Sequence, residues 1–465
     1  MRKLLFIILL GVQVVHAQNL GFNGSGMFEN YDADVEQYLV DLNAPFTIRF
    51  PGGSISKFHD PYNVKRGWGL SESNIKQWFE TTGFDEDGNG LEKWLRKAEE
   101  QPAHSYLDDL IALQKKFPNM QVLWVLNVLN STPEANMQAI RYLMSNGVNI
   151  VGVEAGNEVY GKYASFSEYI PDFEPVFAMI RKEYPKIKLG LIVGANLGRN
   201  DIVRWNDAMA GYKGDFDAVI PHYYYTAREL GEAYDMIPLR NEFDPAKSND
   251  DLCRAYDKAA TLLLEENDLL GDGCRYLQQK FPGKEIWITE WNTKPSEMLN
   301  NTILNGQWQF SQLIEISKMA EYLIIHNGVG PDKYGMISKS NKYDSEPNEM
   351  IRRMGYFAYK LASEARDAKP MSAQNIPNLS KSAKGTYKYY FTNTGEAYTA
   401  DFHIPAGAAI KIHAVAGKHL YSGCGTTGYM GKGSVKSYEV KGINRSDFNN
   451  TIPAYSFGYV EVEVR

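Results

Sequence analysis

Short apolar runs and longer amphipathic stretches alternate along most of the chain. The apolar runs, bounded by Gly, Asn or Pro, are typical of buried strands, and the stretches between them carry apolar residues at helical spacing. The expected strands span residues 20–28, 45–53, 120–128, 149–158, 187–195, 216–224, 284–292 and 333–340. The clearest expected helices span residues 105–117, 134–147, 173–185 and 305–328. This alternation predicts an α/β fold in which eight parallel strands close into a (β/α)8 TIM barrel.

An open, doubly wound sheet is the alternative to a barrel. Such a sheet is expected to carry a phosphate-binding G-x-G-x-x-G loop after its first strand. The first expected strand instead contains GFNGSG at 21–26, which has the spacing G-x-x-G-x-G. We interpret these residues as turn glycines, and the barrel remains the favoured fold.

The pattern changes after residue 370, where helical spacing disappears. Short strands separated by Gly, Pro and Asn follow at 386–394, 397–405, 408–416, 437–442 and 456–464. This pattern predicts a small β-sandwich. The expected domains are therefore a (β/α)8 barrel over 18–370 and a C-terminal β-sandwich over 371–465.

The first residues have the pattern of a secretory signal peptide. Arg2 and Lys3 precede an apolar run at 4–15, and the small residue Ala17 follows. We expect a signal peptide over 1–17 and export to the periplasm or the extracellular space. No later segment has the length and apolarity of a membrane span, so no membrane partner is expected after cleavage.

Charge and cysteine content narrow the range of partners. The formal net charge is −7, whereas nucleic acids and anionic membranes require a basic surface. The three cysteines, Cys253, Cys274 and Cys424, form no C-x-x-C pair, which argues against structural zinc. A local Cys253–Cys274 disulfide and free thiols remain equal alternatives.

Polar side chains stand where several of the expected strands end. In a (β/α)8 barrel the carboxyl ends of the strands form one rim, where active sites lie. The residues at these ends are Arg49 after the second strand, Asn127 after the third, Asn157 and Glu158 after the fourth, His222 and Tyr224 after the sixth, and Glu290 and Trp291 after the seventh. Two carboxylates facing each other across such a rim are what glycoside hydrolysis requires, with no metal or other cofactor.

These motifs carry a resemblance to a known group of enzymes. RFPGG at 49–53, VEAGNE at 153–158, PHYY at 221–224, TEW at 289–291 and the closing segment TIPAYSFGYVEVEV at 451–464 resemble the clan A retaining glycoside hydrolases. Within this clan the chain is most similar to the family 51 α-L-arabinofuranosidases and to the related families 39 and 79. The resemblance implies a carbohydrate substrate, such as a plant or algal polysaccharide or oligosaccharide, cleaved with retention.

The resemblance also implies a role for each matching residue. Glu158 is expected to be the general acid/base and Glu290 the nucleophile. The expected substrate-binding or supporting residues are Asn157, Arg49, His222, Tyr224, Asn127, and Trp291 as a sugar platform. Glu154, four residues before Glu158, is expected to support Arg49 or a neighbouring strand.

Three alternatives remain open at this point. An endo-acting β-glycanase of the same clan would use an open cleft, which Trp68 and Trp78 could line. A sugar-binding barrel without activity is a weaker alternative, because neither carboxylate is missing. The segment Asp85–Asn89 has calcium-loop spacing but lacks the closing acid, since Arg96 occupies that position; a solvated turn is the simpler interpretation.

Overall fold

The computed structural model describes residues 19–60, 66–82, 90–226, 249–266, 268–294, 299–330, 334–339, 350–371, 375–376, 379, 384–402, 405, 407–423, 438–440 and 451–465. The expected signal peptide, the Asp85–Asn89 segment and Cys424 lie outside these residues.

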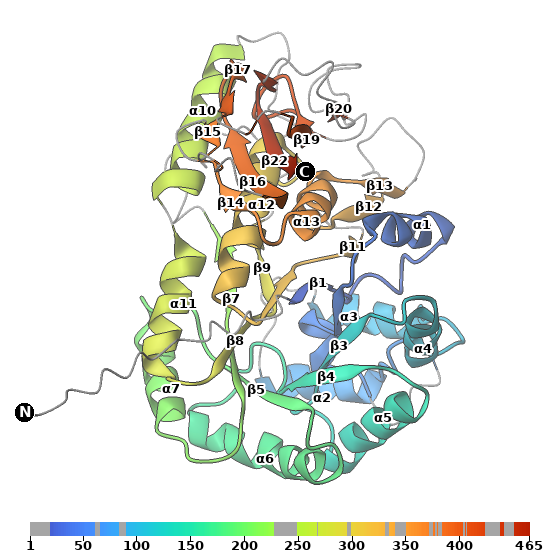
Figure 1. Ribbon diagram of the computed structural model, residues 1–465. Helices are drawn as coiled ribbons and strands as arrows, with labels where there is room; N and C mark the ends of the chain where they lie inside the picture. The colour runs from blue at the N-terminus through green and yellow to red at the C-terminus, as the bar shows by residue number, and fades with distance from the viewer. Residues whose placement is uncertain are drawn as a thin grey trace, which may run out of the picture.

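Eight parallel strands close into a barrel, which occupies the lower half of Figure 1. Around the barrel their order is β1-β10-β8-β6-β5-β4-β3-β2, and β2 pairs with β1 to close the ring. The strands are β1 (Asn19–Asn23), β2 (Thr47–Phe50), β3 (Gln121–Val125), β4 (Ile150–Glu154), β5 (Lys188–Ile192), β6 (Ala218–Ile220), β8 (Glu285–Ile288) and β10 (Tyr322–Ile325). The predicted (β/α)8 barrel is confirmed.

Helices connect the strands and form the outer layer. The α-helices are α1 (Ala33–Leu42), α2 (Glu72–Thr82), α3 (Gly90–Glu99), α4 (Tyr106–Lys116), α5 (Pro133–Ser145), α6 (Phe166–Glu183), α7 (Asn200–Ala210), α10 (Asn249–Thr261), α11 (Leu269–Lys280), α12 (Ile303–Glu315) and α13 (Met354–Glu364). The shorter turns are η1 (Gly53–Lys57), η3 (Leu262–Glu266) and η4 (Ile316–Lys318). Several helices begin at side-chain caps, such as Ser105 before α4 and Thr132 before α5.

The eighth barrel strand differs from the prediction. The expected strand at 333–340 contains only β12 (Ile337–Lys339), which lies outside the barrel in a three-stranded sheet with β11 (Val329–Gly330) and β13 (Met350–Arg352). The barrel is closed instead by β10, which the sequence pattern assigned to the end of the long helix at 305–328. A run of four apolar residues, YLII, fits a buried helix turn and a buried strand equally well, so periodicity cannot distinguish them.

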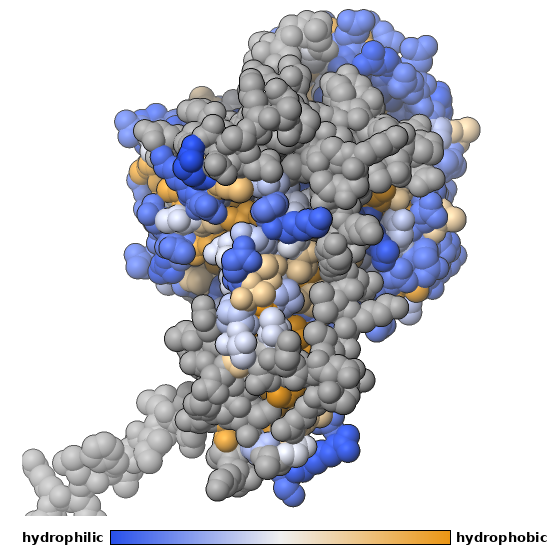
Figure 2. Space-filling view, turned by 90° about the horizontal axis from the view of Figure 1, so that it is seen from above, coloured by the Kyte–Doolittle hydropathy of each residue, from blue (hydrophilic) through white to orange (hydrophobic). Residues whose placement is uncertain are grey.

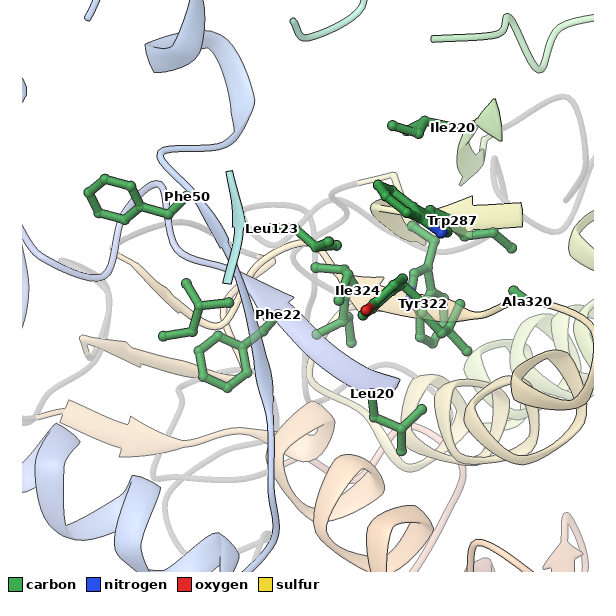
Figure 3. Packing of buried hydrophobic residues seen from close by; sticks show 14 of the residues in the cluster. Leu20, Phe22, Phe50, Leu123, Ile220, Trp287, Ala320, Tyr322 and Ile324 are labelled. Carbon is green, nitrogen blue, oxygen red and sulfur yellow. The ribbon is translucent and has the colours of Figure 1, made fainter. Parts of the chain in front are cut away.

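Close packing fills the lower part of the barrel. Trp287 on β8 is fully buried and meets Tyr322 on β10 edge-on, with ring centroids 5.3 Å apart (Figure 3). The Trp287 ring occupies space beside Gly152 on β4 and Gly190 on β5, where an added Cβ would lie 2.6 Å and 2.9 Å from the indole. Glycines at these positions therefore make room for one large side chain at the bottom of the site.

Two barrel strands continue past the rim after a one-residue break. β7 (His222–Tyr225) follows β6, and β9 (Glu290–Thr293) follows β8. The two extensions pair in parallel, with His222 opposite Glu290 and Tyr224 opposite Asn292. This pairing fixes the mutual position of several expected site residues.

The C-terminal part forms further sheets above the barrel (Figure 1). A five-stranded sheet has the order β14-β16-β22-β19-β20, and two smaller sheets pair β15 with β18 and β17 with β21. The strands are β14 (Lys369–Pro370), β15 (Asn375–Ile376), β16 (Gly385–Asn393), β17 (Tyr398–Thr399), β18 (Asp401–Phe402), β19 (Ala409–Ala416), β20 (Tyr438–Val440), β21 (Thr451–Ile452) and β22 (Ser456–Val464). These sheets enclose a separate cluster of buried side chains that includes Ile412, Val460 and Val462.

The C-terminal sheets are attached to the barrel through α12. Gln307 on this helix donates from Nε2 to the carbonyl oxygens of Asn393 and Ser456. The main-chain N–H of Ile303, at the start of α12, donates to the carbonyl of Ser422. The helix that follows β9 is thereby fixed from both sides.

Two surface properties bear on location and chemistry. No helix of the described residues has both the length and the apolarity needed to cross a bilayer. Seen from above, the described surface is mainly hydrophilic, with hydrophobic residues in small areas between (Figure 2). Among the described residues only Val40, Tyr142 and Leu197 are large hydrophobic side chains classed as exposed.

The two cysteines in the described part of the chain are not joined. Cys253 on α10 and Cys274 on α11 both carry free thiols. Burial raises the pKa of the Cys274 thiol to about 12, so this group is an unreactive core residue at neutral pH.

Candidate active site

Six of the eight expected site residues meet at the carboxyl ends of the strands. They are Arg49 on β2, Asn157 and Glu158 after β4, His222 and Tyr224 on β7, and Glu290 on β9. Hydrogen bonds join Arg49, Asn157, Tyr224 and Glu290 to one another and join His222 to Glu158, and His222 lies 3.8 Å from Glu290. The sequence prediction of a convergent polar rim therefore agrees with the structure for these residues.

Glu290 lies at the centre of this group and is buried. Its Oε1 accepts from Nη1 of Arg49 at 2.5 Å and from Nδ2 of Asn23 at 3.1 Å. Its Oε2 accepts from the Tyr224 hydroxyl at 2.6 Å and lies 3.8 Å from Nδ1 of His222. Donors on three different strands, β1, β2 and β7, thus hold the carboxylate in one orientation.

Arg49 joins three acceptors through one guanidinium. Nε donates to both oxygens of Glu154, at 3.0 and 2.9 Å, and Nη2 donates to Oδ1 of Asn157 at 2.9 Å. The side chains of Arg49 and Glu154 are both fully buried. Glu154 is therefore the expected supporting residue, and the same arginine serves Glu154 and Glu290.

Glu158 stands on a loop and not on a strand as expected. β4 ends at Glu154, and the chain turns through Gly156, whose φ is +93°. Glu158 itself has a φ of +48°, and its side chain is 36% exposed. An added Cβ at Gly156 would lie 2.8 Å from Val159, so the turn depends on a glycine. The turn, rather than strand alternation, directs Glu158 toward the site.

A hydrogen-bonded chain connects Glu158 with Glu154. Nδ1 of His222 lies 3.1 Å from Oε1 of Glu158, and Nε2 lies 3.2 Å from Oγ1 of Thr289. The Thr289 hydroxyl donates to Oε2 of Glu154 at 3.3 Å. Because that hydroxyl proton is used, its oxygen accepts from His222, and Nε2 of the ring carries a proton. Glu158 and Nδ1 of His222 must then share a single proton between them.

The two carboxyl groups titrate in different surroundings. Burial would raise the pKa of the Glu290 carboxyl, but His222, His326, Arg49 and the Tyr224 hydroxyl together hold it well below its usual range. Burial likewise opposes ionisation of Glu158, but the hydrogen bond and charge of His222 keep the pKa of that carboxyl below its usual value. A general acid is expected to have a raised pKa. The pKa of Glu158 is not raised when His222 carries the shared proton.

The donor tyrosine remains protonated throughout. Burial, followed by the charges of Glu290 and Glu158, raises the pKa of Tyr224 well above its usual value. The phenol is accordingly a hydrogen-bond donor to Glu290 over the whole physiological range.

The separation of the two carboxyls is short. Oxygens of Glu158 and Glu290 and a ring nitrogen of His222 all lie within 4.8 Å of one another. Three such atoms could in principle bind a divalent ion. The Glu290 oxygens, however, already accept from Arg49, Asn23 and Tyr224, and a metal there would face the Arg49 cation. The group fits a hydrogen-bonded carboxylate pair better than a metal centre.

A pocket of about 480 Å³ opens beside Glu158. Its walls include Tyr160, Leu197, Arg199, His222 and Tyr224. The pocket offers an aromatic ring, an exposed aliphatic side chain and hydrogen-bonding groups next to a carboxyl group. This combination suits a sugar ring, which has apolar CH faces and polar edges.

Two expected site residues lie elsewhere, and their assignment is corrected. Trp291 is fully buried and packs against Trp308, with ring centroids 5.4 Å apart, so it cannot be a sugar platform. It directly follows Glu290, and strand alternation turns its side chain away from the site. Asn127 is 1% exposed, donates to the His59 carbonyl at 2.6 Å and accepts from the Asn130 N–H, so it shapes loops and does not face a substrate.

The two tryptophans that supported an open aromatic cleft are also buried. Trp68 is 2% exposed and Trp78 is 4% exposed. Trp68 packs on Phe50 at 5.1 Å and donates from Nε1 to Glu29. These side chains cover the barrel, so the endo-acting alternative loses its sequence support.

Sequence reasoning missed three residues of this site. Thr289 directly precedes Glu290, and Asn23 ends the first strand, where attention went to the glycines around it. His326 directly follows β10 and could not be found, because that strand was assigned to a helix. Its Nδ1 lies 3.7 Å from Oε2 of Glu290 and 3.3 Å from Nδ2 of Asn23.

Known proteins share this architecture at low sequence identity. No protein-family model and no curated protein matches the sequence. The structure of a family 51 α-L-arabinofuranosidase, AbfB from Bifidobacterium longum, is similar with a TM-score of 0.53 and 13% identity, over 97% of this chain and 93% of that one. A conserved exported protein from Bacteroides fragilis is similar with a TM-score of 0.51 and 11% identity, over 97% and 99% of the two chains. The resemblance to family 51 is thereby confirmed at the level of the fold.

Proposed function

We propose that this chain is a retaining glycoside hydrolase that acts on plant or algal polysaccharide or oligosaccharide. The observation that carries the proposal is the pair Glu158 and Glu290 at a barrel rim, with nearest oxygens within 4.8 Å. Retaining enzymes hold their carboxyls about 5–5.5 Å apart, whereas inverting enzymes leave about 6.5–9.5 Å for a water molecule. The short separation favours double displacement.

In the first step Glu290 attacks the anomeric carbon and Glu158 protonates the departing oxygen. Oε2 of Glu290 is the attacking atom, because it accepts one hydrogen bond, from Tyr224, whereas Oε1 accepts two, from Arg49 and Asn23. The bond from the anomeric carbon to the leaving oxygen breaks as the new ester bond forms. The departing alcohol takes the proton that Glu158 shares with His222.

In the second step water releases the sugar from Glu290. Glu158, now without its proton, takes one from the attacking water, and the Glu290 carboxylate leaves. Esterification removes the negative charge of Glu290, and this charge is one of the influences that raise the pKa of Glu158. Loss of the Glu290 charge therefore lowers the pKa of Glu158. The lower pKa keeps Glu158 ionised as its role changes from acid to base.

The substrate side of the proposal draws on the pocket and the fold. The pocket beside Glu158 would hold the leaving group, with Tyr160 and Leu197 against its apolar face. An α-L-arabinofuranoside is the first substrate to test, because the AbfB structure shares this fold. The sequence pattern at 1–17 supports export, which predicts a mature chain that begins at Gln18.

Two substitutions test the proposed function. Glu290→Ala and Glu158→Ala should each lower kcat/KM on an aryl glycoside by at least ~10²–10⁴-fold. Azide should rescue both, yielding a glycosyl azide of inverted configuration from Glu290→Ala and of retained configuration from Glu158→Ala. Glu183→Ala, on the outer surface of α6, is the control and should behave as wild type. Full activity in Glu290→Ala would overturn the proposal.

A further inference from the structure

Asn23 contacts the expected nucleophile from the first barrel strand. It is fully buried, and its Nδ2 donates to Oε1 of Glu290 at 3.1 Å. The Asn23 Oδ1 accepts from the main-chain N–H of Ser25 at 3.1 Å. Because a main-chain N–H can only donate, this bond determines which end of the amide is oxygen. The Asn23 NH₂ group is therefore directed at Glu290.

The second proton of that NH₂ group reaches His326. Nδ1 of His326 lies 3.3 Å from Nδ2 of Asn23. Since Nδ2 is a donor only, Nδ1 must accept, and the neutral His326 ring carries its proton on Nε2. The His326 carbonyl accepts from Nδ2 of Asn292 at 2.5 Å, and the Tyr334 ring packs against the imidazole at 4.9 Å. These contacts hold the imidazole in place as an acceptor.

The backbone is also adapted to the Asn23 amide. Gly52, in the RFPGG segment, has a φ of +71°, and an added Cβ there would lie 2.3 Å from Oδ1 of Asn23. A side chain at this position would displace the amide from Glu290. The structure therefore requires a glycine at position 52, independently of any contact with substrate.

We propose that Asn23 and His326 form a positioning pair for the Glu290 carboxylate. His326 and Ser25 orient the Asn23 amide, which holds Oε1 beside Arg49 and so leaves Oε2, whose hydrogen-bond donor is the Tyr224 hydroxyl, as the attacking atom. Neither residue exchanges a proton or a bond with the substrate. The proposal rests on the proposed function, since it assigns these residues a task in aligning the nucleophile.

The hydrogen bond between Asn23 and His326 requires that Nδ1 of the imidazole carries no proton. A proton on Nδ1 would place two donors, on Asn23 and His326, against each other at 3.3 Å. The resulting imidazolium would be drawn toward Oε2 of Glu290, 3.7 Å away, and would occupy the attacking atom. The other titratable groups facing this ring are Tyr224 and Tyr334, and beyond Glu290 lie Arg49 and His222. The positioning pair therefore requires an Nδ1 of His326 that carries no proton.

Substitutions at both positions test the pair against a merely structural role. Asn23→Ala and His326→Leu should each lower kcat roughly 10- to 100-fold, the effect of losing a hydrogen bond at a charged group, with KM changed less than about threefold. His326→Gln, whose Oε1 can accept from Asn23, should restore most of kcat, whereas a merely structural defect would not be rescued by this change. Asn19→Ala, at the opposite end of β1, and the surface variant His104→Leu are the controls and should match wild type.

Nitrogen NMR of histidine-labelled wild-type protein tests the same geometry without turnover. The signals of His326, assigned by their loss in His326→Gln, should show a protonated Nε2 and an unprotonated Nδ1 at neutral pH. A proton on Nδ1, or wild-type kcat in both Asn23→Ala and His326→Leu, would overturn the positioning pair. Full activity in Glu290→Ala would instead overturn the proposed function, so the two failures are distinguishable.

Discussion

Nη1 of Arg49 lies 2.5 Å from Oε1 of Glu290, while Nε of the same guanidinium bonds to both oxygens of Glu154. One buried cation is therefore the charge partner of two buried carboxyl groups. Removing it would leave two acids without their charge partner inside the barrel. We predict that Arg49→Met lowers the free energy of unfolding by roughly 3–5 kcal/mol, the usual cost of breaking a buried ion pair.

Urea unfolding of the purified variant at neutral pH measures this effect. Arg141→Met is the matched control, because Arg141 pairs with Glu183 on the exposed surface and should change stability little. Equal stability of Arg49→Met and wild type would show that Glu154 and Glu290 do not depend on Arg49.

The pH dependence of stability should report the depressed pKa of Glu290. A carboxyl whose pKa is lower in the folded chain stabilises the fold above its unfolded pKa, near 4.3, and loses that contribution as pH falls toward the folded value. The stability difference between wild type and Glu290→Gln should therefore be largest at neutral pH and shrink below about pH 4. Denaturant unfolding of both proteins at several pH values measures it. A difference independent of pH would contradict the depressed pKa.

Thr289→Val should impair the acid step more than the attack. When the Thr289 hydroxyl is absent, Nε2 of His222 has no acceptor, and the ring can carry its single proton on Nδ1 instead. His222 then donates that proton to an ionised Glu158, which has no proton of its own for the leaving group. We expect kcat to fall about 3- to 10-fold on substrates with poor leaving groups, the effect of one lost hydrogen bond, and less on activated aryl glycosides.

The ratio of kcat for a poor and a good leaving group is the measurement for Thr289→Val. Thr386→Val, on an exposed position of β16, provides the control. An equal loss on both substrates would indicate a general packing defect and not a defect of protonation.

Substitutions of Trp291 and Tyr160 should distinguish a residue that packs in the core from one that contacts the substrate. Trp291→Ala removes a fully buried ring and should lower the free energy of unfolding by roughly 3–5 kcal/mol. Tyr160→Ala removes a ring from the pocket wall and should raise KM about fivefold, which corresponds to an aromatic contact of roughly 1 kcal/mol. Thermal unfolding and steady-state kinetics of both variants check this. A larger KM change in Trp291→Ala than in Tyr160→Ala would restore Trp291 as a substrate contact.

The positions of most strands, and the polar residues at their ends, could be predicted from the sequence. Buried parallel strands need continuous apolar runs, and a barrel brings their carboxyl ends to one rim, so Arg49, Glu158, His222 and Glu290 could be predicted to meet. The same reasoning placed Glu154 beneath them as support. Each inference depends only on the local pattern and on a general property of the fold.

The tertiary structure decided what local pattern leaves ambiguous. YLII at 322–325 is a strand because it pairs with β1 and β8 and so closes the barrel. This pairing brings His326 close to Glu290. Trp291 and Asn127 have residue types suited to sugar binding, yet one faces the core and the other holds loops. The shared proton of Glu158 and His222 depends on the Thr289 hydroxyl, after β8, and on the Glu154 carboxylate, at the end of β4. The sequence by itself determined which residues reach the rim; the direction of each side chain and its partners came from packing between distant segments.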